Sequence, residues 1–217
     1  SFSRLFDFKV GVFCLFSFFL VSCSGNSQLE TEINSIDVTI NIDRFDLNFH
    51  KANSKEYFQL KKKYPYLFPE QYPDSIWKKR QRDSIQVLLH EEIKKVYPTL
   101  IPVEEALEDL YKHIKYYFPS IKDPHVVTVV NNVDYQSKTV FTDSLLIISL
   151  DTYLGSKNPI YEGIPNYIVK DMEFDYMTSH IVDELGTLAV RSPKDRAMLG
   201  QMVYYGKKLY LKDKIAS

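Results

Sequence analysis

The sequence predicts an α+β protein in which a helix-rich domain surrounds a small mixed β-sheet. Residues 125–130 and 145–150 are almost continuously apolar, with many β-branched or aliphatic side chains, as is usual for central strands covered on both faces. Residues 36–42 alternate apolar and polar side chains, which is typical of a half-buried strand. Residues 102–118 carry apolar side chains at helical spacing. Apolar strands together with an amphipathic helix predict a fold in which helices pack on a sheet.

The composition is that of an ordinary globular domain and indicates no nucleic-acid partner. The chain has 217 residues, of which 45% are hydrophobic, and its 27 Lys and Arg are balanced by 28 Asp and Glu. Binding to nucleic acid needs a surplus of basic side chains along one surface. We therefore expect no nucleic acid among the partners.

Residues 1–22 have the features of a lipoprotein signal peptide. Arg4 and Lys9 flank the start of an apolar run over residues 10–21, which is shorter than the roughly 20 residues that span a bilayer. The run ends in Leu20-Val21-Ser22-Cys23, which resembles a bacterial lipobox. We expect acylation of Cys23 and a membrane contact through that lipid. The alternative is a plain secretory signal with an incidental cysteine.

The rest of the chain divides into a tether and a domain. Residues 23–35 are predicted to form a flexible tether, because residues 24–28 are small and polar. Residues 36–217 are predicted to form the α+β domain. Cys23 is the only cysteine after residue 22, so no disulfide is expected within the mature chain. Ser24 is not the Asp that retains enteric lipoproteins in the inner membrane, so by analogy we expect an outer-membrane anchor facing the periplasm.

Three helices are predicted in the first half of the domain. One covers residues 53–63 and is followed by a proline-rich connector, residues 64–73, in which regular structure is excluded. A second covers residues 74–97 and is expected to bury Ile85, Leu89, Ile93 and Val96. The third covers residues 102–118, with a proline and acids at its start. Its expected buried stripe is Val103, Leu107, Leu110, Ile114, Tyr117 and Phe118.

The second half is predicted to contain strands and two further helices. Residues 125–130, 139–141 and 145–150 are the expected strands, and a loop with Pro and Gly covers residues 155–165. A helix reaching about Arg191 is expected to bury Phe174, Met177, Ile181, Leu185 and Leu188. Ser192-Pro193 is typical of a helix start. The helix that follows is expected to bury Met198, Met202, Tyr205 and Leu209.

Two long motifs resemble a known family. Residues 145–155, LLIISLDTYLG, and residues 195–210, DRAMLGQMVYYGKKLY, together with the lipobox, closely resemble the gliding-motility lipoprotein family GldB of Bacteroidetes. The resemblance implies an envelope lipoprotein required for gliding and linked to the type 9 secretion system, acting with other protein components of the gliding apparatus. It transfers no catalytic role. Members of the family also extend past the tyrosine-rich helix, so we expect the domain to be incomplete at its C-terminal end.

The order of strand, loop and His-bearing helix is similar to that of the zincin metallopeptidases, and GldB-like proteins look distantly related to them. A zincin places two His four residues apart and a Glu directly after the first. Here the residues are His180-Ile181-Val182-Asp183-Glu184, so Ile181 replaces the general base and Glu184 the second His. A structural, hydrogen-bonded pair is therefore expected. The alternative function is a zinc-dependent metallopeptidase or a degenerate pseudo-peptidase.

Three other motifs are expected to have no catalytic or ligand-binding role. His90-Glu91 is followed by Lys94 where a second ligand would stand, and a protonated lysine only donates, so a solvated helix face is expected. Residues 200–207 have glycines with five residues between them, where a P-loop has four. Glu104-Glu105 is expected to be solvated charge. Cys23 is thus the one predicted site residue, and no catalytic residue, metal ligand or cofactor is predicted.

Aromatic side chains are concentrated in and after the proline-rich connector. Two interpretations remain open for them: anchors for protein partners, or packing against the domain's own core. The residues are Tyr64, Tyr66, Phe68, Tyr72 and Trp77.

Overall fold

The computed structural model describes residues 25–142, 144–194 and 197–216, and the chain divides into one unit up to Asp37 and a second from Val38 onward. The described part of the first unit contains α2, Gly25–Asn34. A helix therefore occupies most of the segment that was expected to be a flexible tether. Leu, Gln and Glu side chains, which favour helix, outnumber the small polar residues after Ser27. The predicted signal peptide and Cys23 lie outside the described residues.

The second unit is built on one four-stranded mixed sheet, as predicted. The strands are β1 (Asn41–Asp43), β2 (His125–Val129), β3 (Thr139–Phe141) and β4 (Leu145–Ser149), in the order β1-β2-β4-β3. β1, β2 and β4 are parallel, and β3 pairs with β4 antiparallel at the edge. The strand predicted over residues 36–42 is reduced to three paired residues, because only Asn41, Ile42 and Asp43 face partners on β2.

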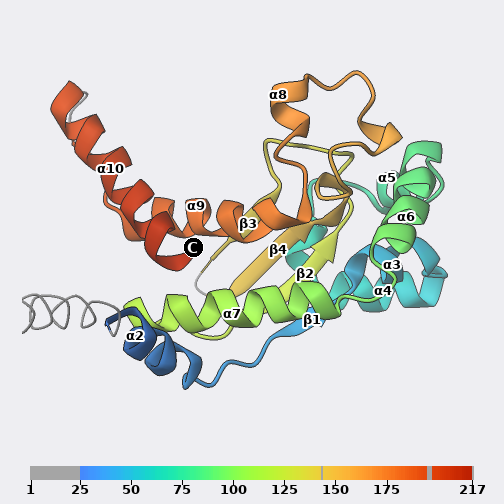
Figure 1. Cartoon of the computed structure of the whole chain (residues 1–217). Coiled ribbons are helices and arrows are strands. Elements are labelled where there is room, and N and C mark those ends of the chain that lie inside the picture. Colours follow the sequence, from blue (N-terminus) through green and yellow to red (C-terminus); the bar gives the residue numbers. More distant parts are fainter. Residues whose placement is uncertain (1–24, 143, 195–196, 217) are drawn as a thin grey trace, which may run out of the picture. The chain divides into compact units, whose positions relative to one another are not determined.

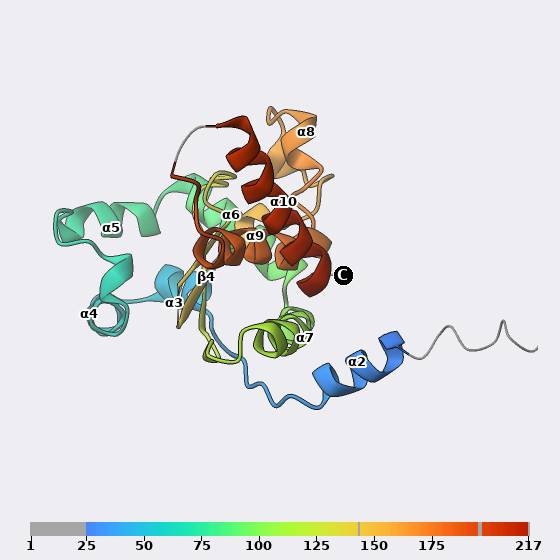
Figure 2. The ribbon, with the colours of Figure 1, turned by 90° about the vertical axis from the view of Figure 1, so that its left-hand side faces the viewer.

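Both faces of the sheet are covered by other elements. Neighbouring residues of β2, whose side chains point to opposite faces, are buried in different clusters. Val126 belongs to a large core with α7 (Ile101–Tyr117) and α9 (Met177–Ala189), whereas Val127 belongs to an aromatic cluster on the opposite face. In Figure 2, α3, α4 and α5 lie on one side of the strands and α7 on the other. The buried rings of the aromatic cluster are Phe45, Phe49, Tyr57, Tyr64 and Phe68.

The helices on the aromatic side are short, and one of them has a side-chain cap. They are α3 (Phe45–Lys51), which the sequence did not predict, α4 (Ser54–Lys63) and α5 (Asp74–Gln81). Asn53 and Glu56 form a reciprocal capping box at the start of α4. A short 3₁₀ turn, η2 (Pro65–Leu67), lies in the proline-rich connector.

The helix predicted over residues 74–97 is two helices. α6 (Ser84–Val96) begins after Asp83, whose carboxylate accepts the backbone N–H of Ile85 and Gln86, so the capping aspartate starts a new helix. The predicted buried face is also shifted. Leu89 and Ile93 are buried as expected, but Ile85 is 58% exposed and Val96 40% exposed, and Gln86 and His90 are buried instead.

The predicted stripe of α7 is confirmed at its centre, since Val103, Leu107, Leu110 and Ile114 are buried. Further along the chain lie the 3₁₀ turns η3 (Leu150–Thr152), η4 (Pro159–Tyr161) and η5 (Phe174–Tyr176), and the one-turn helix α8 (Asn166–Val169). α9 buries Met177, Ile181 and Leu185 as predicted, but Leu188 is 57% exposed.

The last helix, α10 (Met198–Ile215), starts later than predicted and buries a different face. The four residues expected to be buried, Met198, Met202, Tyr205 and Leu209, are 59–77% exposed. The helix packs on α9 and α7, with Leu211, Ile215 and Ala216 in or against the core (Figure 1). Both faces of α10 carry apolar side chains, which is why the apolar spacing alone selected the wrong one. Among the described helices, none combines the length and hydropathy needed to cross a bilayer.

Candidate functional site

A cavity of about 280 Å³ lies beyond the carboxyl ends of the parallel strands, on the aromatic side of the sheet. We call it the Trp77 cavity. Ligand sites of sheets with parallel strands commonly lie beyond this edge. Residues from three strand ends contribute to it, with one wall from η2, α5 and α6. Its lining consists of Phe45, Asp46, Phe49, His50, Tyr66, Leu67, Pro69, Trp77, Arg80, Gln86, His90, Val129, Val130, Asn131, Ser137, Val140, Ile147 and Ser149.

Two buried nitrogen atoms of the lining have no hydrogen-bond partner in the described structure. They are Nε1 of Trp77 and Nδ1 of His90. Buried polar atoms are almost always paired, with protein, water or ligand. His90 is only 3% exposed, so its expected place on a solvated face is wrong. The sequence argument that His90 is not part of a zinc motif gave no indication that its ring faces a cavity.

His90 also contacts a second imidazole of the lining. The ring centroids of His50 and His90 are 4.2 Å apart, with the planes tilted by 32°. Burial lowers the pKa of His50, and burial together with the neighbouring His50 lowers the pKa of His90. Both rings are therefore favoured in the neutral form at neutral pH, when each has one donor and one acceptor nitrogen.

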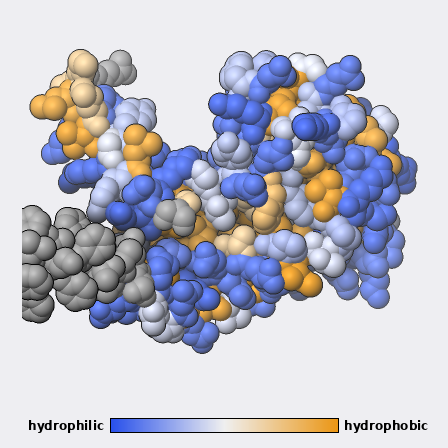
Figure 3. Space-filling view, viewed as in Figure 1, coloured by the Kyte–Doolittle hydropathy of each residue, from blue (hydrophilic) through white to orange (hydrophobic). Residues whose placement is uncertain are grey.

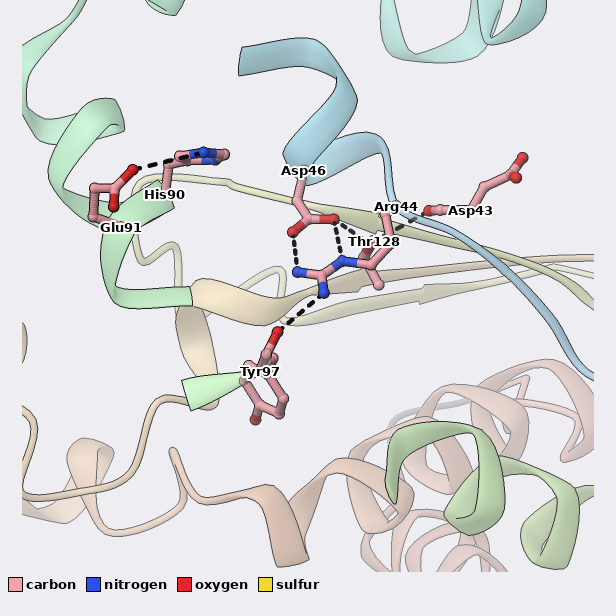
Figure 4. A network of polar contacts seen from close by, with 7 residues as sticks. All are labelled: Asp43, Arg44, Asp46, His90, Glu91, Tyr97 and Thr128. Atoms are coloured by element: carbon pink, nitrogen blue, oxygen red, sulfur yellow. Dashed lines mark hydrogen bonds and ion pairs between the residues drawn. The ribbon is translucent and has the colours of Figure 1, made fainter. Parts of the chain in front are cut away.

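Asp46 forms the polar floor of the cavity and is held by two neighbours (Figure 4). Arg44 contacts both of its carboxylate oxygens, at 3.2 Å and 2.7 Å, and Thr128 donates to Oδ1 at 2.6 Å. Arg44 also donates to the carbonyl of Tyr97 at 3.0 Å. The Asp46 side chain has no solvent-exposed surface, and Arg44 and Thr128 match its charge within this network.

The rim of the cavity is a strained loop that follows β2. Asn132 and Val133 have φ values of 55° and 56°, and positive φ is a genuine outlier for a β-branched residue such as valine. The carboxylate of Asp151 accepts the backbone N–H of Asn131 at 3.0 Å and of Val133 at 2.6 Å. Burial raises the pKa of Asp151, and these N–H groups oppose that rise. Such strain persists only where surrounding contacts hold it.

Two further side chains tie helices to this loop. Arg80 of α5 donates through Nη2 to the carbonyl of Val130 at 3.1 Å, and the amide of Gln86 on α6 hydrogen-bonds Oδ1 of Asn132. The sequence did not single out Arg80, Asp46, Asp151 or His50. The one signal available was the position of Asp151 directly after an apolar strand.

The structure separates the two residues of the predicted His180–Glu184 pair. His180 is partly buried and its Nδ1 lies 3.0 Å from the hydroxyl of Tyr153, whereas Glu184 is exposed. Burial, with a further contribution from Lys138, lowers the pKa of His180 to about 4. No group of three or more His, Cys, Asp and Glu side chains suited to a metal occurs among residues 25–142, 144–194 and 197–216.

The aromatic residues in and after the connector differ in burial, and the partner-anchor interpretation stays a prediction for the exposed ones. Tyr64 and Phe68 are buried in the aromatic cluster, Trp77 is partly buried, and Tyr66 and Tyr72 are 43% and 45% exposed. Trp77 packs against the same cluster, with its ring centroid 5.1 Å from that of Phe68, so core packing accounts for three of the five. Residues 200–207 lie inside α10, so their backbone N–H groups are not arranged as a phosphate loop.

An exposed apolar face runs along α10. In Figure 3 its apolar side chains gather at the upper left, where α10 lies in Figure 1. From Ala197 to Lys212 the described positions carry no acidic residue. Lys207 is exposed, whereas Lys208 and Lys212 reach Thr187 and Asp183 of α9. We call this surface the α10 face. It consists of Met198, Leu199, Met202, Val203, Tyr205, Leu209 and Tyr210, each 49–77% exposed.

Fold and surfaces together define a helix-rich α+β domain with a cavity on one sheet face and an exposed apolar helix. A family model described as gliding motility protein GldB matches residues 26–217, so the chain belongs to the GldB family of gliding motility proteins. The lipoprotein label of that model agrees with the lipobox-like motif before Cys23. A search of curated proteins and a search of solved structures found no match. The zincin-like relationship therefore stays a prediction.

Proposed function

We propose that the protein is a lipid-anchored component of the cell envelope that acts in gliding by binding other proteins, without catalysing a reaction. In this proposal its partners are components of the gliding apparatus and the type 9 secretion system. Cys23 carries the lipid, and the domain faces the periplasm from the outer membrane. Membership of the GldB family supports the link to gliding.

The α10 face is the observation that carries the proposal. Met198, Met202, Tyr205 and Leu209 recur at spacings of four, three and four, so they share one side of the helix. Leu211 and Ile215 occupy the opposite side and pack on the core. Contiguous exposed apolar surface is uncommon on a monomeric protein and usually marks an interaction site.

The composition of the α10 face favours a protein partner. Two methionines provide adaptable apolar contacts, and two tyrosines provide large rigid ones. The exposed Lys207 at one edge of the face suits a partner whose rim is acidic, whereas Lys208 and Lys212 bond to Thr187 and Asp183 of α9. A buried apolar centre with a charged rim is the usual composition of such interfaces.

The arrangement around His180 supports the non-catalytic part of the proposal over the peptidase alternative. Nδ1 of His180 is already bonded to Tyr153, and no carboxylate follows His180 directly to accept a proton from an attacking water. Glu184 lies on the exposed side of α9.

Photo-crosslinking in living cells tests the proposal. A photoreactive amino acid at Met202 is expected to capture envelope proteins of the gliding or type 9 secretion machinery, identified by mass spectrometry. The same amino acid at Lys62, an exposed position of α4, is the matched control and should capture none of them. Equal products from the two positions, or none from Met202, would contradict the proposal.

A further inference from the structure

We propose that the Trp77 cavity binds a small ligand with an apolar body and a carboxylate, and that Arg80 and the indole N–H of Trp77 receive the carboxylate. The inference concerns a site on the opposite side of the sheet from α9 and does not depend on the α10 face. It is carried by the charge balance of the cavity, by its unused donors, and by its size and walls.

The spare charge of the cavity is positive. Of its described lining residues, Asp46 is the one carboxylate and Arg80 the one guanidinium or ammonium group. Asp46 is neutralised by Arg44 on both oxygens. Arg80 has no ion pair within the described structure; burial lowers its pKa, and the nearby charges of Asp151 and Asp83 oppose that fall. An anionic group beside Arg80 would complete the balance.

Hydrogen-bond donors without acceptors on Trp77 and Arg80 also favour a ligand with a carboxylate. Trp77 and Arg80 are three residues apart on α5, so they lie on one side of that helix. A guanidinium has five N–H donors, and the described residues accept one of those of Arg80, at the carbonyl of Val130. The buried Nε1 of Trp77 has no acceptor. A carboxylate accepts several hydrogen bonds at once, which suits this pair of residues.

The remaining walls suit an apolar body. Phe45 and Phe49 stack with ring centroids 5.3 Å apart, and Val129 and Ile147 of the sheet contribute aliphatic surface. The volume of about 280 Å³ is nearly twice that of the roughly 150 Å³ apolar cavity that accommodates benzene. A phenyl ring with a short acid chain is therefore of suitable size. Val140 and Tyr66, 44% and 43% exposed, lie at the entrance.

Two sources of this chemistry are possible: a free carboxylic acid, and the C-terminal carboxylate of a peptide that ends in an apolar residue. Trp77 is the only tryptophan of the chain, so its fluorescence reports directly on the cavity. The purified protein is titrated with 3-phenylpropionate and with its neutral amide, and separately with acetyl-Gly-Gly-Phe as the free acid and as the amide.

We expect the fluorescence of Trp77 to change saturably with 3-phenylpropionate. The affinity for 3-phenylpropionate should be at least tenfold higher than the affinity for its amide. Binding of the peptide acid as well would identify a chain terminus as a second source, and its failure would restrict the site to free acids. Both outcomes support the proposal. Equal affinity for 3-phenylpropionate and its amide, or no saturable change with either, would overturn it.

Variants locate the site. Arg80→Gln should reduce affinity for 3-phenylpropionate at least tenfold and leave affinity for the amide nearly unchanged, a difference that a general loss of folding would not produce. Lys79→Gln, an exposed neighbour on the same helix, is the control and should bind like the unchanged protein. Should Arg80→Gln fold poorly, Ile147→Phe narrows the cavity from the sheet side without adding a second tryptophan, and binding that survives in this variant would contradict the proposed location.

Discussion

The hydroxyl of Thr128, the penultimate residue of β2, donates a 2.6 Å hydrogen bond to the carboxylate of Asp46 in the first turn of α3. This contact ties α3 to the sheet across 82 residues of chain. Asp46 is in turn paired with Arg44. The floor of the Trp77 cavity is therefore a buried charge whose partners come from a strand and from the residue that precedes the helix.

Removal of either partner of Asp46 should destabilise the fold. Arg44→Gln leaves a buried carboxylate without its counter-charge, which costs about 3–5 kcal/mol. Thr128→Val removes one donor and should cost about 1–3 kcal/mol. Urea unfolding measures both, with Arg191→Gln, at an exposed position, as a control expected within about 0.5 kcal/mol of the unchanged protein. Losses no larger than that of the control would show that the network adds little.

The centre of the α7 stripe should be highly sensitive to truncation. Leu110→Ala and Ile114→Ala each remove buried methyl groups from the main core and should lower the free energy of unfolding by about 2–5 kcal/mol. Asp109→Ala, exposed on the same helix, should change it by less than about 0.5 kcal/mol. Lys115 is a poorer control, since it pairs with Asp123 at 2.6 Å. Small losses at Leu110 and Ile114 would mean that this face is loosely packed.

His180 should make stability depend on pH. Its pKa is about 4 in the folded protein, compared with 6.5 as the ordinary value, so unfolding takes up a proton between these limits and stability falls as the pH falls from about 6.5 to 4. Partial solvent exposure reduces the effect below the roughly 3 kcal/mol that the full shift would imply.

Thermal unfolding from pH 7 to pH 4 checks this. His180→Gln should lose part of the decline, with the remainder due to His50 and His90, whose pKa values are lowered too. Lys55→Gln, at an exposed position of α4, should retain the decline. An unchanged pH profile in His180→Gln would contradict the assigned burial of this ring.

The lipid anchor is tested at the cysteine of the lipobox-like motif. Cys23→Ser removes the sulfur that would be acylated, so the protein should lose its lipid and leave the membrane fraction. Metabolic labelling with a palmitate analogue and fractionation measure the two effects. Labelling and membrane partition equal to those of the unchanged protein would favour an uncleaved apolar anchor over residues 10–21.

The strands of the main sheet were predictable because their apolar runs are continuous. Residues 125–130, 139–141 and 145–150 correspond closely to β2, β3 and β4. The break between α5 and α6 was not predicted, because Asp83 serves as a cap only in the context of a chain that changes direction there. Apolar spacing also failed on α10, where two apolar faces compete and tertiary packing selects the one with Leu211 and Ile215.

Most of the candidate site could not be predicted from the sequence. Asp46, Arg80 and His90 come from three different helices, and only the fold brings them to one cavity. His90 was even assigned to solvent, since its neighbours Glu91 and Lys94 are charged and do face outward. Aromatic content was a better guide, because Tyr64 and Phe68 do pack in the cluster beside the cavity.

Binding without catalysis is best tested by the gliding of cells that carry either a doubly substituted α10 face or a substituted His180. Met202→Lys with Leu209→Lys places charge on the α10 face and leaves its buried side intact, whereas His180→Ala removes the partly buried imidazole of α9 that the peptidase alternative needs as a zinc ligand. At equal expression, and with folding verified by circular dichroism, we expect the α10 variant to stop gliding and His180→Ala to glide nearly normally. Normal gliding of the α10 variant would contradict the account. So would a folded His180→Ala protein that loses both motility and about one bound zinc per chain.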